Sequence, residues 1–96
     1  MHVVDNFSDP SEAQRKAKKY LGKNAQLFLS SRKNKKYMVI TPDDKLVHFG
    51  AIGYEDFTKH KDKERRDAYL RRATKIKGNW KNNKYSPNNL AINILW

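Results

Sequence analysis

The sequence predicts a small α+β domain, and three observations lead to this prediction. A capped amphipathic helix pattern comes first, three short segments rich in β-forming residues follow it, and a highly charged helical stretch fills much of the second half. The chain has 96 residues, of which 38% are hydrophobic. A chain of this size buries one modest core, so we expect a single basic domain over residues 1–96.

The first helix is predicted at 10–21. Asp9 is a typical N-cap residue, Pro10 suits the first helical position, and Glu12 completes a capping pattern. Gly22 is the expected end of the helix. The apolar face of this helix comprises Ala13, Ala17, Tyr20 and Leu21.

Three strands are predicted at about 25–30, 36–41 and 45–49. A polar turn that contains Asn34 separates the first two, and the segment from Thr41 to Asp44 is a turn by composition. The simplest arrangement is a three-stranded antiparallel meander that packs against the first helix, because three strands need such a cover to be stable.

Two further helices are expected in the second half. A basic helix is predicted at about 61–76, with Gly78 as its stop, and a short C-terminal helix at 87–95 begins at the capping signal Ser86-Pro87. A strand is the competing interpretation of the last segment, because Ile92 and Ile94 alternate with a polar residue.

Positive charge dominates the composition, with 21 Lys and Arg against 10 Asp and Glu and a net charge of +11. Such an excess attracts polyanions, and lysines favour contact with phosphates over the reading of bases. The alternative is a solvated surface, partly supported by acid–base pairs within the basic helix. The predicted polyanion-binding residues are Arg15, Lys16, Lys19, Arg32, Lys33, Lys35, Lys36, Lys61, Arg65, Arg66, Arg71, Arg72 and Lys75.

Aromatic residues are interleaved with these cations, and two tryptophans stand apart. Core packing is the favoured interpretation of the aromatics, and stacking on nucleic-acid bases is the alternative. Trp80 and Trp96 are predicted to dock against a partner. For Trp96 two environments stay open, the core of its own chain, which is preferred, and a neighbouring subunit.

No pattern for catalysis, a metal or a cofactor is found. The chain has no cysteine, its histidines show no metal-ligand spacing, and no Gly-rich phosphate loop is present. Adjacent acids at Asp43-Asp44 and Glu55-Asp56 leave a small metal-dependent nuclease as a second alternative. No apolar run reaches the roughly 18 residues that span a bilayer, and we expect no membrane partner.

The segment from residue 48 to residue 69 contains a motif that resembles a known family of proteins. His48-Phe49-Gly50, Gly53-Tyr54, Asp56-Phe57-Thr58 and His60-Lys61-Asp62, followed by Arg65 and Tyr69, form a pattern. This pattern resembles a largely uncharacterised family of small basic proteins of large double-stranded DNA viruses of eukaryotes. The resemblance implies a viral origin more than a biochemical role.

Within this pattern an architectural role is preferred to a ligand site. Gly50 and Gly53 are expected to set a turn, Asp56 and Thr58 to cap or brace the following helix, and His60 and Tyr54 to pack or hydrogen-bond. Taken with the charge, the resemblance implies a non-enzymatic virion component, a minor capsid or internal protein. It would bind an acidic viral protein surface or packaged DNA, in several copies, and be present in the host cytoplasm during assembly. The alternative is a free nucleic-acid-binding protein that contacts the phosphate backbone.

Overall fold

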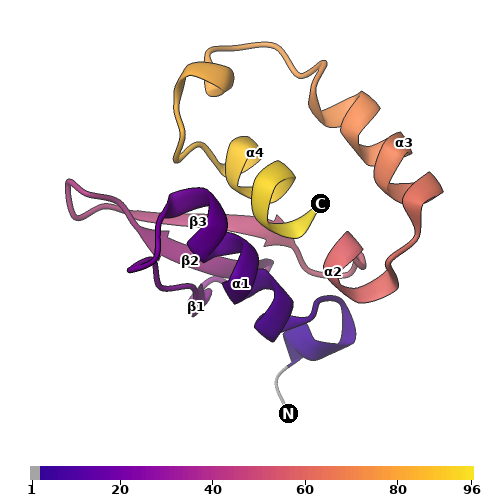
Figure 1. The fold of residues 1–96 in the computed structure, drawn as a ribbon, viewed down its shortest axis with the longest axis horizontal. Helices are drawn as coiled ribbons and strands as arrows, with labels where there is room; N and C mark the ends of the chain where they lie inside the picture. The colour runs from indigo at the N-terminus through magenta and orange to yellow at the C-terminus, as the bar shows by residue number, and fades with distance from the viewer. Residues whose placement is uncertain (1–2) are drawn as a thin grey trace.

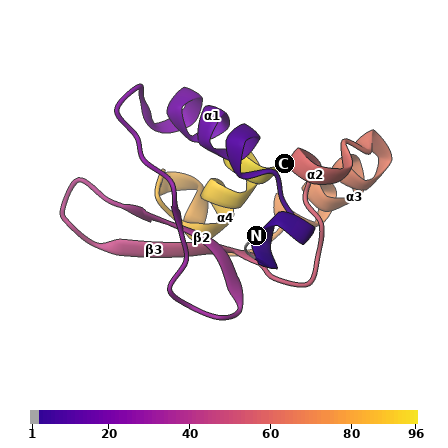
Figure 2. The same ribbon diagram turned by 90° about the horizontal axis from the view of Figure 1, so that it is seen from below.

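A computed structural model describes residues 3–96 as an antiparallel sheet covered on one face by helices. Figures 1 and 2 show α1 (Pro10–Leu21) and α4 (Pro87–Leu90) over this face, while α3 (Lys63–Ala73) lies to one side of it. A short 3-10 turn, Val3–Asn6, precedes the first helix. The predicted α+β class is therefore confirmed. None of the helices in the described residues is long and apolar enough to cross a membrane.

Helix α1 spans Pro10–Leu21, as the sequence predicts. The Asp9 carboxylate accepts hydrogen bonds from the backbone N–H groups of Ser11 (3.1 Å) and Glu12 (3.4 Å). These bonds satisfy N–H groups that would otherwise lack partners in the first turn. Ala13 and Ala17 are fully buried, so the small side chains of this helix face the core.

The sheet is the predicted meander, in the order β1-β2-β3. The strands are β1 (Phe28–Leu29), β2 (Lys35–Ile40) and β3 (Leu46–Ala51). Strand β1 is shorter than the predicted 25–30 because the Gln14 side chain of α1 forms hydrogen bonds with backbone groups at the start of that segment. Its Nε2 donates to the Ala25 carbonyl (3.2 Å) and its Oε1 accepts from the Leu27 N–H (3.0 Å).

The core lies between the sheet and the helices. On the covered face of the sheet, Tyr37 pairs with Phe49 and Val39 with Val47. The fully buried residues packed around this face include Val4, Ala13, Ala17, Leu90, Ile94 and Leu95. The opposite face of the sheet is open, and Ile40 and Leu46 are 51% and 54% exposed there.

The predicted basic helix at about 61–76 is α3 (Lys63–Ala73), and a short helix that was not predicted, α2 (Phe57–His60), precedes it. Lys61 adopts a left-handed conformation with φ of 59°, which ends α2. Asp62 then caps α3 by accepting from the N–H groups of Glu64 (3.0 Å) and Arg65 (3.3 Å). Two capping aspartates close together in sequence therefore begin two separate helices.

The C-terminal segment is helical, so the competing strand interpretation is wrong. Helix α4 spans Pro87–Leu90 and continues as a π-helix, Ala91–Leu95, after a 3-10 turn at Trp80–Asn82. Ser86 caps α4 by accepting from the Asn89 N–H at 3.2 Å. The helical geometry places Leu90, Ile94 and Leu95 together in the core.

Candidate functional site

A buried ion pair lies where the sheet meets the motif segment. Lys36 Nζ is 3.1 Å from Asp56 Oδ2, and the two side chains are 3% and 0% exposed. Lys36 Nζ also donates to the Tyr54 carbonyl at 2.6 Å. Burial lowers the pKa of Lys36, against the opposing attraction of the Asp56 carboxylate. The prediction that Lys36 binds a polyanion is therefore wrong, because this cation is already paired and shielded from solvent.

A chain of hydroxyl groups extends from this ion pair. Asp56 accepts from the Thr58 N–H (3.0 Å) and from the Thr58 hydroxyl. Ser8 Oγ lies 3.0 Å from Thr58 Oγ1 and accepts from the Tyr37 hydroxyl at 2.7 Å. Burial raises the pKa of Tyr37. Asp56 therefore caps α2 and not the basic helix, for which its capping role was predicted, since Asp62 caps α3. The chain of hydroxyl groups ties the start of α1 to both the sheet and α2.

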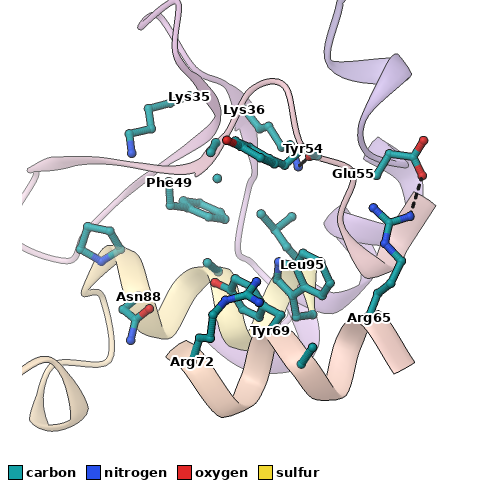
Figure 3. A pocket seen from close by; sticks show the side chains of 16 residues that line it. Lys35, Lys36, Phe49, Tyr54, Glu55, Arg65, Tyr69, Arg72, Asn88 and Leu95 are labelled. Carbon is teal, nitrogen blue, oxygen red and sulfur yellow. Dashed lines mark hydrogen bonds and ion pairs between the residues drawn. The ribbon is translucent and has the colours of Figure 1, made fainter. Parts of the chain in front are cut away.

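Gly50 and Gly53 form the predicted reversal after β3. Their φ angles are 82° and 101°, a region that favours glycine. A Cβ on Gly50 would lie 2.8 Å from Leu95 Cδ1, so the backbone here approaches the C-terminal segment closely. The reversal is joined to the β1–β2 turn, since the Ile52 N–H donates to the Asn34 carbonyl at 3.2 Å. Tyr54 and Glu55 follow this reversal, and Arg65 of α3 reaches the Glu55 carboxylate (Figure 3).

Helix α3 is held in place by the last residue of the chain. Trp96 stacks on Tyr69 with ring centroids 4.2 Å apart and an angle of 10° between the planes. The Trp96 carbonyl accepts from Arg66 Nε at 2.8 Å. Asn88 of α4 donates to the Ala73 carbonyl at 3.0 Å. Of the two predicted environments of Trp96, the structure places it against its own chain.

A pocket of about 720 Å³ separates α3 from the end of the sheet (Figure 3). Phe49 and Leu95 lie at its apolar wall. The side chains that give it its chemical character are Lys35, Tyr54, Arg65, Tyr69, Arg72 and Trp96. Tyr54 is 73% exposed, so its ring is free to contact a ligand rather than being used in packing.

The charge inside this pocket is positive. Arg65 NH1 lies 3.8 Å from Glu55 Oε1, which partly neutralises one cation. Among residues 3–96, no ion pair engages Arg72 or Lys35. Figure 3 shows Arg72 extending from α3 beside Tyr69. The pocket therefore combines aromatic surface with cations that have no carboxylate partner.

A second group of predicted cations meets at Phe57. Lys16 of α1 and Arg66 of α3 lie over its ring, at 6.0 and 5.5 Å from the centroid. Burial and the neighbouring positive charge of Arg66 lower the pKa of Lys16. This contact brings the basic residues of α1 next to those of α3.

The other predicted cations are exposed and are not part of either group. Arg15 pairs with Glu12 within α1. The remaining exposed cations of the prediction are Lys19, Arg32, Lys33, Lys61, Arg71 and Lys75.

The other motif and docking residues have structural partners. His48 Nδ1 lies 2.7 Å from Ser30 Oγ on the open face of the sheet. His60 accepts from the Asp62 N–H at 2.9 Å and packs near Trp96. Trp80 donates from Nε1 to the Ile76 carbonyl at 2.6 Å, and its predicted docking role stays a prediction. In the described part of the chain, no three His, Asp or Glu residues gather as metal ligands.

Sequence reasoning did not include Tyr69, Glu55 or Leu95 among the site residues. A signal for Tyr69 was present, because Arg65, Tyr69 and Arg72 stand at i, i+4 and i+7 and therefore share one face of α3. For Leu95 no local signal exists, since its place in the pocket depends on how the C-terminal segment folds back.

These features define a small α+β protein with a one-sided sheet and a cationic, aromatic-lined pocket beside it. Residues 25–73, about half of the chain, match a family of unknown function, DUF5754, and the chain belongs to this family. The match covers the sheet, the motif and α3, and thus most of the pocket. No curated protein and no solved structure matched the chain. The viral resemblance stays a prediction.

Proposed function

We propose that the protein is a non-enzymatic basic component of a large DNA virus particle that binds the phosphates of packaged nucleic acid. One observation carries the binding part of the proposal. Of the 21 Lys and Arg residues, the ion pairs of the described chain engage four, namely Arg15, Lys36, Lys45 and Arg65. Most of the positive charge is therefore left for an external anion.

Few of these cations form ion pairs within the protein, as helix α3 shows. The i,i+4 partners of the basic helix, Asp62 with Arg66 and Asp67 with Arg71, form no ion pair among residues 3–96. Arg66 instead contacts Phe57 and the Trp96 carbonyl. A helix that stabilised itself by such pairs would show them, so the surface of α3 supports contact with a ligand.

Nucleic acid is favoured over an acidic protein surface by the pocket. Arginine beside aromatic rings suits phosphate and base together. The location in a particle depends on the resemblance alone, and the alternative of a free nucleic-acid-binding protein shares the same surface.

The binding is tested by titrating the protein with fluorescent DNA at several salt concentrations. If about six phosphates are neutralised, log affinity falls with log salt at a slope near −5. The variant R65Q/R72Q is expected to bind more weakly than K18Q/K23Q, a control that loses the same charge from exposed residues of α1 and the turn after it. Equal affinities would show that charge alone, without α3, determines binding.

Absence of any DNA binding at 50 mM salt would contradict the nucleic-acid proposal and favour an acidic protein partner. Mass spectrometry of purified particles tests the second part, because a packaged component is recovered with the particle. A protein found only in infected-cell extracts would support the free binding protein instead.

A further inference from the structure

We infer that the pocket between α3 and the end of the sheet binds one unpaired nucleotide of single-stranded nucleic acid. This inference rests on the proposed function and names the part of the nucleic acid that enters the site. Three properties of the pocket lead to it: its size, its aromatic surface and the position of its cations.

The size fits a small ligand rather than a peptide helix or a duplex. The volume of about 720 Å³ lies within the roughly 300–1,000 Å³ typical of small-molecule sites. A paired base inside a duplex is inaccessible to such a pocket, because a base must leave the stack to enter one. Single strands present their bases without this cost.

The aromatic surface provides a place for the base. Tyr54 stands on the turn after β3 and is 73% exposed, while Tyr69 and Trp96 stack on each other at the opposite side. The Tyr69–Trp96 stack fixes these two rings before a ligand arrives. An exposed ring facing a fixed aromatic pair is suited to hold a flat, apolar group between them.

The cations lie around the same space. Arg72 and Arg65 project from one face of α3 (Figure 3), and Lys35, at the start of β2, also lines the pocket. Glu55 is the one acidic side chain among the described lining residues, and Arg65 engages it at 3.8 Å. Arg72 and Lys35 are therefore the groups positioned to receive the phosphate. Guanidinium groups match phosphate oxygens in geometry as well as charge.

The experiment uses the two tryptophans of the chain. In a Trp80→Phe variant, Trp96 is the single tryptophan and reports on the pocket by its fluorescence. The probes are single-stranded oligothymidylate and an abasic oligonucleotide of the same length and phosphate number. We expect oligothymidylate to bind about 10-fold more tightly, as stacking of a base predicts, and to quench Trp96.

Two substitutions in this background locate the effect. Tyr54→Ala removes an exposed ring and Arg72→Ala an exposed guanidinium, so neither is expected to unfold the protein. Tyr54→Ala is expected to abolish most of the 10-fold preference, because it removes a ring that stacks on the base. Arg72→Ala is expected to weaken the binding of both oligonucleotides, because both carry the phosphate that this residue receives. The matched control is Arg71→Ala, which removes the same charge from the neighbouring position of α3 outside the pocket lining. This control is expected to weaken the binding of both oligonucleotides less than Arg72→Ala does.

Equal affinity for the two oligonucleotides, or equal effects of Arg72→Ala and Arg71→Ala on the affinity, would overturn the inference and leave the proposed function standing. Failure of both oligonucleotides to bind at low salt would overturn both. Thymidine monophosphate that binds as tightly as the oligonucleotide would also overturn the inference, by making the pocket a site for free nucleotides.

Discussion

Tyr69 of α3 and Trp96 at the end of the chain stack with their ring centroids 4.2 Å apart and their planes nearly parallel. This contact joins two segments that are distant in sequence. It is also one wall of the pocket, so the position of α3 and the shape of the site depend on the same pair of rings.

Replacing one ring of this stack should loosen α3. Tyr69→Ala is expected to destabilise the protein by about 2–3 kcal/mol, because it removes a half-buried ring together with a stacked pair. Urea denaturation followed by circular dichroism measures this loss. Tyr69→Phe keeps the stack and is expected to stay within about 0.5–1 kcal/mol of the original protein. A Tyr69→Ala protein as stable as the Phe variant would show that the stack contributes little.

The buried ion pair should show strong coupling. Lys36→Met and Asp56→Asn are each expected to destabilise the protein by about 3–5 kcal/mol, because each leaves a buried polar group without its partner. The double variant is expected to lose less than the sum, since both unpaired groups are then removed. A double-mutant cycle by chemical denaturation gives the coupling free energy.

The exposed pair Lys45–Asp43 is the matched control for that cycle. Its atoms lie 3.6 Å apart, and its side chains are 77% and 66% exposed. Surface pairs of this kind contribute about 0–1 kcal/mol, so the coupling in the control cycle should be small. Similar coupling in both cycles would contradict the importance of burial.

The two glycines of the reversal should respond differently to alanine. Gly53→Ala introduces only an unfavourable φ of 101°, because no atom lies within 4 Å of the added Cβ. A loss of about 1–2 kcal/mol is expected from this strain. Gly50→Ala adds a clash 2.8 Å from Leu95 Cδ1 and is expected to cost about 1–3 kcal/mol more. Thermal unfolding of both variants compares them, and equal losses would indicate that the backbone shifts to relieve the clash.

Stability should fall in mildly acidic solution because of His60. Burial, with the nearby charge of Arg65, lowers the pKa of His60 below the ordinary 6.5, and its Nε2 is buried without a hydrogen-bond partner among the described residues. The unfolded chain therefore takes up a proton before the folded protein does. The contribution to stability is present above pH 6.5 and is lost as the pH falls through the lower folded pKa.

Denaturation midpoints measured between pH 7.5 and 5 test this dependence. His60→Asn keeps an acceptor near the Asp62 N–H but removes the titrating ring, so its stability should vary less over this range. An unchanged pH profile in the variant would assign the dependence to other groups.

Several elements follow from the sequence because their signals are local. Asp9, Pro10 and Gly22 fix the ends of α1 through hydrogen bonds and φ angles within a few residues, and the structure has the same bounds. The meander follows in the same way from short β-forming runs separated by turns. The excess of positive charge follows directly from the amino-acid composition. The reversal at Gly50 and Gly53 follows from two glycines that lie close together in the sequence.

The tertiary structure alone decided which cations are available. Lys36 lies near the start of β2 and resembles the neighbouring basic residues in the sequence, yet it is buried against Asp56, twenty positions later. Likewise Asp62, which the sequence places inside the basic helix, is the N-cap of that helix, and the short α2 before it was not predicted. The pocket is formed only when Trp96 folds back onto Tyr69. Burial and stacking between distant segments depend on the path of the whole chain, whereas caps and turns are decided by their immediate neighbours.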